Sequence, residues 1–143
     1  MTGRKIDSHF TASPQITPEM VAAIAAEGFT TIICNRPDGE EDGQPRSADV
    51  RAAAEAAGLT WEFIPVTAAG FSGNQVEAMV GALNKSDGPV FAYCRSGTRS
   101  TNLWALAKAS EGSDPDTLIA AGAQGGYDLN GIRPLLDTLS GKA

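Results

Sequence analysis

The chain has 143 residues, 42% of them hydrophobic and 20% charged, which is the composition of an ordinary globular domain and not of a disordered segment. Its 17 acidic residues outnumber its 11 basic residues, and the net charge of −6 argues against nucleic acid or an anionic membrane as a partner. Two cysteines are too few for a disulfide framework, and no apolar run follows the basic residues near the start. These features predict one cytoplasmic domain over residues 1–143, with no membrane-spanning segment.

Helical and strand patterns alternate along the chain. Thr17 and Pro18 place a capping hydroxyl before a proline at the first helical position, and Ser72 with Gln75 fits a capping box. Apolar residues at helical spacing, or in short β-branched runs, define the other elements. The predicted elements are an edge strand around His9 and Phe10, a helix over 17–28, a strand over 29–34, a helix over 47–58, a strand over 59–66, a helix over 72–85, a strand over 89–93, and helices over 100–109, from Asp114 and over 129–139.

This alternation predicts an α/β domain with a central, mainly parallel sheet of four to five strands flanked by helices. Ligands of such sheets bind beyond the carboxyl ends of the strands. We therefore expect the loops 35–45, 67–71 and 94–99 to share one rim of the sheet, with the third loop between a strand and a helix.

The loop from Cys94 to Arg99 carries the strongest chemical signal. A thiol reacts as its thiolate, and three features favour that form of Cys94: a helix that starts after the loop, a glycine that turns backbone amides inward, and the forked cation Arg99. Ser100 is expected to donate a hydrogen bond to the sulfur. We predict Cys94 as nucleophile rather than as a core cysteine, assisted by Arg99 and Ser100. The predicted anion-binding residues of the loop are Arg95, Ser96, Gly97 and Thr98.

The segment 94–100 resembles the active-site loop of rhodanese-type sulfurtransferases and the phosphate loop of dual-specificity phosphatases. Over nearly its whole length the chain is similar to the phosphatase-like domain family of β-lactamase-hydrolase-like proteins. The matching segments are 31–41, 63–66, 89–104 and 123–129. The resemblance implies a protein-tyrosine-phosphatase-like fold of the dual-specificity type, with Cys94 as nucleophile and Arg99 as anion binder. Members are described both as phosphatases and as sulfurtransferases, so both reactions stay open.

Two departures from the phosphatase pattern favour sulfur transfer. Four residues separate Cys94 from Arg99, one fewer than in phosphatases of this fold, and a tighter ring suits a sulfur atom better than a phosphoryl group. The segment 67–72, where such phosphatases carry an acidic Asp, has no carboxylate, and loss of a general acid costs about 10²- to 10⁴-fold in rate. Our leading hypothesis is a sulfurtransferase: Cys94 takes sulfane sulfur from thiosulfate or a persulfide and passes it from a Cys94 persulfide to a small or protein acceptor.

The alternative is a phosphatase that hydrolyses phosphomonoesters through a phosphocysteine at Cys94, with Asp38 as general acid. The segment 36–40 sets carboxylates beside Arg36, and four roles stay open: acid, substrate contact by Arg36, a salt bridge to Arg99, or a solvated turn. A third hypothesis, from a different class, is a non-catalytic anion-binding module with an inert loop.

The remaining candidates are weaker. Cys34 is expected to be a small buried hydrophobe, and Tyr127 is a candidate to brace the pocket. The single histidine and two separated cysteines form no metal-ligand cluster, so neither a metal nor another cofactor is expected.

Overall fold

The computed structural model describes residues 3–141 and contains one five-stranded sheet, in the order β1-β2-β5-β3-β4. β1 pairs antiparallel with β2, and the other neighbours are parallel, so the predicted mainly parallel sheet is confirmed. The strands are β1 (Arg4–Lys5), β2 (Phe10–Ser13), β3 (Thr31–Cys34), β4 (Thr60–Phe63) and β5 (Val90–Tyr93).

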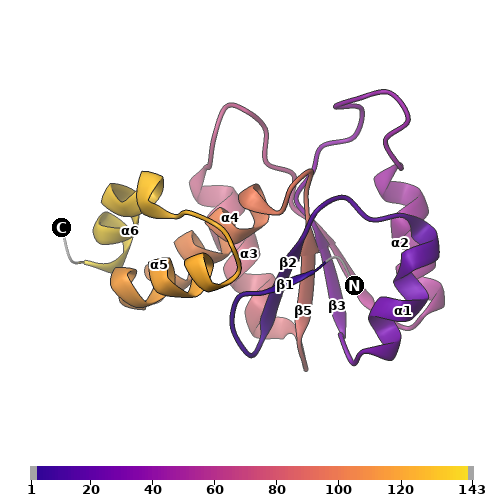
Figure 1. Cartoon of the computed structure of the whole chain (residues 1–143), viewed down its shortest axis with the longest axis horizontal. Coiled ribbons are helices and arrows are strands. Elements are labelled where there is room, and N and C mark those ends of the chain that lie inside the picture. The colour runs from indigo at the N-terminus through magenta and orange to yellow at the C-terminus, as the bar shows by residue number, and fades with distance from the viewer. Residues whose placement is uncertain (1–2, 142–143) are drawn as a thin grey trace.

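Helices cover both faces of the sheet (Figure 1). On one face lie the 3₁₀ turn η1 (Pro18–Met20), α1 (Val21–Ala26) and α2 (Ser47–Ala56). On the other lie α3 (Gly73–Lys85), α4 (Thr98–Ser110), α5 (Pro115–Gln124), the 3₁₀ turn η2 (Asn130–Ile132) and α6 (Arg133–Ser140). The loops that follow β3 and β4 rise at the same edge of the sheet, where β5 also leads into α4 (Figure 1).

Successive side chains of β5 pack alternately into two apolar cores, one on each face of the sheet. Val90 and Ala92 belong to the core under α3 to α6, whereas Phe91 and Tyr93 belong to the core under α1 and α2. Because both faces are covered, the whole strand is apolar and buried, as expected of a central parallel strand. The buried central strand β5 therefore fixes the position of Cys94 at the rim of the sheet.

Helix α4 is the other fixed support of the rim. Most of its residues are buried, including Leu103, Trp104 and Leu106, because it lies between the sheet and the surrounding helices. Trp104 also stacks on Phe10 of β2, with ring centroids 5.7 Å apart. The position of the amino end of α4 is therefore set by core packing along the body of the helix.

Three boundaries differ from the sequence prediction. The strand around Phe10 is not at an edge, because Arg4 and Lys5 pair with its free side and become the edge themselves. β4 ends at Phe63, before Pro65. α4 begins at Thr98, two residues earlier than expected from its apolar pattern, so Arg99 belongs to the first helical turn and not to the loop. No helix within residues 3–141 is long and apolar enough to cross a bilayer.

Candidate active site

Cys94 directly follows β5, its side chain is buried, and the short turn from Cys94 to Gly97 folds back on its sulfur. Gly97 adopts φ +97°, the left-handed conformation that glycine accepts without strain, and its N–H donates to Cys94 Sγ at 3.0 Å. Gly97 is also the N-cap of α4, so the positive end of the helix begins beside the sulfur. The turn therefore places one backbone N–H and the start of a helix beside the sulfur, the arrangement that the sequence analysis expects of an anion-binding loop.

Tyr127 supports this turn from outside. Its hydroxyl donates to the carbonyl oxygen of Ser96 at 3.0 Å, and a Cβ added at Gly97 would overlap the same hydroxyl. Ser96 Oγ bonds Thr98 Oγ1 at 3.0 Å, so these two hydroxyls also hold the turn together. Position 97 therefore requires glycine for two reasons: its left-handed backbone conformation and the close approach of Tyr127.

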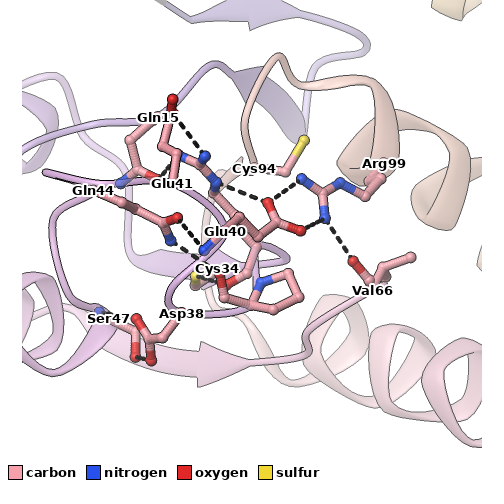
Figure 2. A network of polar contacts seen from close by, with 12 residues as sticks. Gln15, Cys34, Asp38, Glu40, Glu41, Gln44, Ser47, Val66, Cys94 and Arg99 are labelled. Carbon is pink, nitrogen blue, oxygen red and sulfur yellow. Dashed lines mark hydrogen bonds and ion pairs between the residues drawn. The ribbon is translucent and has the colours of Figure 1, made fainter. Parts of the chain in front are cut away.

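Arg99 is held by Glu40 and Val66 so that the other edge of its guanidinium lies on the Cys94 side. Nη1 donates to Glu40 Oε2 at 2.8 Å and to the Val66 carbonyl at 2.7 Å, while Nη2 donates to Glu40 Oε1 at 2.7 Å. The remaining N–H groups, Nε–H and the second Nη2–H, form the opposite edge of the guanidinium, a fork that matches two oxygens of an oxyanion. A hydrogen bond between Arg99 and the Cys94 side chain also contributes to the raised pKa of Arg99. In Figure 2 Glu40 and Val66 lie on one side of the guanidinium and Cys94 on the other.

Glu40 lies between two arginines. Besides Arg99, its Oε1 accepts from Arg36 Nε at 2.9 Å. The hydrogen bond from Arg99, followed by that from Arg36, lowers the pKa of the Glu40 carboxyl from 4.5 to about 2. Glu40 is therefore ionised at neutral pH, and the same pairing raises the pKa of Arg99.

Arg36 is a buried support and does not contact the cavity. Its side chain is 2% exposed, and its remaining nitrogens donate to Glu41 Oε1 at 2.8 Å and Gln15 Oε1 at 3.0 Å. The prediction that Arg36 binds the anion directly is wrong, because all three of its nitrogens point at protein oxygens. Of the roles left open for the segment 36–40, the salt bridge to Arg99 is the one present, and Glu40 makes it.

Two further expectations are corrected. Asp38 faces away from Cys94: its two oxygens accept from Ser47 N at 2.7 Å and Ser47 Oγ at 2.6 Å, at the amino end of α2 (Figure 2). The Oγ of Ser100 is buried without a hydrogen-bond partner in the part of the chain described, so the expected bond to the sulfur is absent. Neither side chain is placed to act as predicted.

The three expected loops do meet at one rim. A cavity of about 410 Å³ is lined by Glu40, Ala68, Arg95 and Arg99. These residues come from the loops after β3, β4 and β5 and from the first turn of α4. Arg95 and Arg99 make this cavity locally cationic although the chain as a whole is acidic. A small anion is the ligand that such a site favours.

Sequence reasoning missed Gln15 and the Val66 carbonyl. Gln15 lies far from the motif in sequence, and the parallel pairing of β2 with β5 brings it near the rim. A backbone carbonyl carries no sequence signal. The expectation that Cys34 is structural fits its position, since it is buried, donates to the carbonyl of Arg36 at 3.3 Å, and has a pKa raised by burial.

Comparisons with known proteins agree with this geometry. Residues 3–111 match the family model described as beta-lactamase hydrolase-like protein, phosphatase-like domain. A beta-lactamase hydrolase-like protein of Agrobacterium fabrum is 37% identical over 112 residues, which is 78% of this chain but 26% of that protein. The chain thus spans about a quarter of the length of that relative.

Solved structures extend the likeness to the fold. A protein of Neisseria meningitidis, described as a "putative phosphatase", is 39% identical, with a TM-score of 0.84 over 97% of this chain and 99% of that one. PTPMT1, at 12% identity, has a TM-score of 0.74 over 99% of each chain, which shows the same tyrosine-phosphatase-like fold. The chain is a member of the phosphatase-like domain family of beta-lactamase hydrolase-like proteins.

Proposed function

We propose that the protein is a cysteine-dependent phosphatase that hydrolyses small phosphomonoesters through a phosphocysteine at Cys94. The observation that carries this proposal is the fork of Arg99 on the Cys94 side of a guanidinium whose other N–H groups are held by Glu40 and Val66. A nucleophile beside a fixed fork binds a tetrahedral oxyanion and attacks its central atom in the same pose.

The first step transfers the phosphoryl group to sulfur. The Cys94 thiolate attacks phosphorus in line with the ester oxygen, a P–S bond forms, and the P–O bond breaks with its electron pair left on the departing oxygen. The Gly97 N–H and the end of α4 stabilise the thiolate beforehand, and Arg99 compensates charge on the phosphoryl oxygens. One such positioned donor is worth about 10²- to 10³-fold in rate.

The second step regenerates the enzyme. Water attacks the phosphocysteine, the P–S bond breaks with its electron pair on sulfur, and inorganic phosphate leaves. The thiolate returns to the position where the Gly97 N–H donates to it. The cycle needs no cofactor and no metal.

The comparisons favour this reaction over sulfur transfer, because the family and the solved relatives named above are phosphatase-like. PTPMT1 has been crystallised in complex with PI(5)P, a phosphomonoester, on the same fold. Both observations support a small anionic phosphoester as the substrate class of this chain.

The test is hydrolysis of 4-nitrophenyl phosphate by the wild type and by Cys94→Ser. We expect turnover in the wild type and a loss of about 10⁴-fold or more in the variant, since removing a nucleophile removes the covalent route. Cys34→Ser is the matched control, because it changes the other cysteine, and it should retain activity. Hydrolysis that survives Cys94→Ser would contradict the proposal.

Sulfur transfer is the second candidate, and the spacing of the loop favours it. Only Cys94 to Gly97 precede the helix, and four residues separate Cys94 from Arg99, the rhodanese length. A Cys94 persulfide formed from thiosulfate would pass its sulfur to a small thiol or a protein acceptor.

Intact-mass measurement after incubation with thiosulfate separates the candidates. Addition of one sulfur atom to the wild type but not to Cys94→Ser, with no phosphate ester hydrolysed, would establish sulfur transfer instead of phosphatase chemistry. A protein with neither reaction would be the non-catalytic anion-binding module.

A further inference from the structure

The carboxylates of the loop after β3 that lie nearest the two arginines accept hydrogen bonds. Glu40 accepts from both Arg99 and Arg36, and these bonds keep it ionised, with a pKa of about 2. It is the one carboxylate among the residues that line the cavity. An ionised carboxylate that already accepts from two guanidinium groups has no proton to give to a leaving group.

The neighbouring carboxylates are committed in the same way. Asp38 holds both its oxygens on Ser47, at the start of α2. Glu41 accepts from Arg36 at 2.8 Å, and that bond lowers its pKa. Both side chains are therefore held by donors of the protein.

The other walls of the cavity offer methyl groups and cations. Ala68 lies in a tight turn in which Thr67 and Gly70 pair, and it is the residue of that loop that lines the cavity. On the far side of the Cys94 turn, Tyr127 donates its hydroxyl to Ser96. Next to it, the carboxylate of Asp128 accepts from the backbone and side-chain nitrogens of Asn130, which lowers its pKa.

Histidine, the commonest proton donor near neutral pH, lies at the opposite end of the sheet. The chain has one histidine, His9, and its carbonyl accepts from Val90 N where β5 begins, whereas Cys94 follows the carboxyl end of that strand. The side chains around the cavity are thus arranged to bind an anion, and the described residues that line it offer a departing oxygen no protonated carboxyl and no imidazolium.

From this arrangement we propose that the substrates are phosphate esters or anhydrides with weakly basic leaving groups, aryl or acyl phosphates, and not alkyl phosphates. The inference rests on the proposed phosphatase function and specifies the substrate class of the same site. The leaving oxygen departs as its own anion, keeping the electron pair of the P–O bond, and takes its proton from water afterwards.

Leaving-group basicity then decides the rate. The conjugate acid of a carboxylate leaving group has a pKa of about 4 and that of a phenolate about 10, whereas the conjugate acid of an alkoxide has a far higher pKa, near that of water. A general acid reduces the dependence of the rate on leaving-group basicity. Its absence lowers the rate by about 10²- to 10⁴-fold, mostly for strongly basic leaving groups. Aryl and acyl phosphates are therefore expected to react faster than alkyl phosphates by at least about 100-fold.

The test compares kcat/KM for acetyl phosphate, 4-nitrophenyl phosphate, phenyl phosphate, 4-methoxyphenyl phosphate and glycerol 2-phosphate with the wild-type protein. We expect a steep fall along this order, with glycerol 2-phosphate at least about 100-fold below phenyl phosphate. A shallow dependence, with Cys94-dependent turnover of glycerol 2-phosphate close to that of phenyl phosphate, would overturn the inference and leave the phosphatase proposal intact.

Two controls keep the outcomes apart. Cys94→Ser run on the same series shows whether any turnover is enzymatic, and a series in which no member reacts through Cys94 overturns both proposals. Asp38→Asn and Asp128→Asn should leave the steepness of the series unchanged. A variant that steepens it would reveal that carboxyl as a general acid, which would contradict the inference.

Discussion

The loops after β3 and β5 lie at the same rim of the sheet, but different groups fix their structures. The turn from Cys94 to Gly97 is made mainly of backbone: one N–H on the sulfur, one left-handed glycine and the start of a helix. The loop over 35–46 is made of charged side chains, with Arg36 and Glu40 at its centre. The first loop holds Cys94, the proposed nucleophile, and the second fixes Arg99, the proposed anion binder.

This difference explains why the sequence predicts the geometry of the first loop but not the side-chain pairing of the second. Backbone geometry of the turn depends on residues next to each other, so a short motif predicts it. The charge network depends on which of several carboxylates reaches Arg99, and that choice is made by folding. The next predictions test whether the two loops act together as this division of roles implies.

Among the residues that support Cys94, the largest effect is expected from Arg99→Lys. A lysine keeps the charge but has no second edge, so it cannot pair with Glu40 on one side and bind an oxyanion with a fork on the other. We expect kcat/KM for 4-nitrophenyl phosphate to fall by about 10²- to 10³-fold. Arg95→Lys is the matched control at the cavity mouth and should lose much less. Equal losses in both variants would mean that charge alone, and not the fork, matters.

Releasing Arg99 from the other loop should have the next largest effect. Glu40→Gln removes the ionised partner of Arg99 while keeping the size of the side chain, so the guanidinium is no longer fixed in its pose. A small misplacement of a binding group costs up to about 10²-fold, and we expect a kcat/KM loss of about 10- to 100-fold. Glu41→Gln, which touches Arg36 but not Arg99, is the control. Unchanged activity in Glu40→Gln would break the link between the loops.

The same pairing should make stability depend on pH. Glu40 has a pKa of about 2 in the folded protein against 4.5 for the free group, so the unfolded chain takes up the proton first as the pH falls. The stability that this group contributes is complete above pH 4.5 and is lost as the pH falls towards 2. Urea unfolding at neutral pH and near pH 3 should show a smaller acid-induced loss in Glu40→Gln than in the wild type.

Removing the outer support of the Cys94 turn should have a smaller effect. Tyr127→Phe deletes the hydroxyl that donates to Ser96 but keeps the ring. One hydrogen bond contributes about 1 kcal/mol, so we expect a loss of several-fold in kcat/KM and faster alkylation of a less ordered Cys94. Thermal unfolding of the variant checks that the fold is intact. Wild-type kinetics would show that the turn holds its shape without Tyr127.

The smallest effect on activity is expected at Asp38. Asp38→Ala should lower the free energy of unfolding by about 1 kcal/mol, because the start of α2 loses its acceptor, while kcat/KM stays within about twofold. The two quantities are measured by urea unfolding and by turnover of 4-nitrophenyl phosphate. A large loss of turnover with unchanged stability would restore Asp38 as a catalytic acid.

The sequence alone predicts the α/β class, the mainly parallel sheet and the shared rim, which the structure confirms. It also predicts Cys94 as the reactive residue, and that stays a prediction. Each follows from local patterns: strand and helix periodicity, capping residues such as Ser72 and Asp114, and a glycine placed before a helix. Such features depend on residues within a few positions of one another, and their energetics carry over from peptide to protein.

The pairing of the charged side chains is seen in the tertiary structure and is not predicted by the sequence. The sequence of the segment 36–41 allows Asp38, Glu40 or Glu41 to face Arg99, and the fold selects Glu40 by burying Arg36 behind it and placing Asp38 on Ser47. The contacts of Gln15 with Arg36 and of Val66 with Arg99 arise in the same way, from segments far apart in the chain. Pairing between charges depends on distances and burial set by the whole fold, and no short motif encodes them.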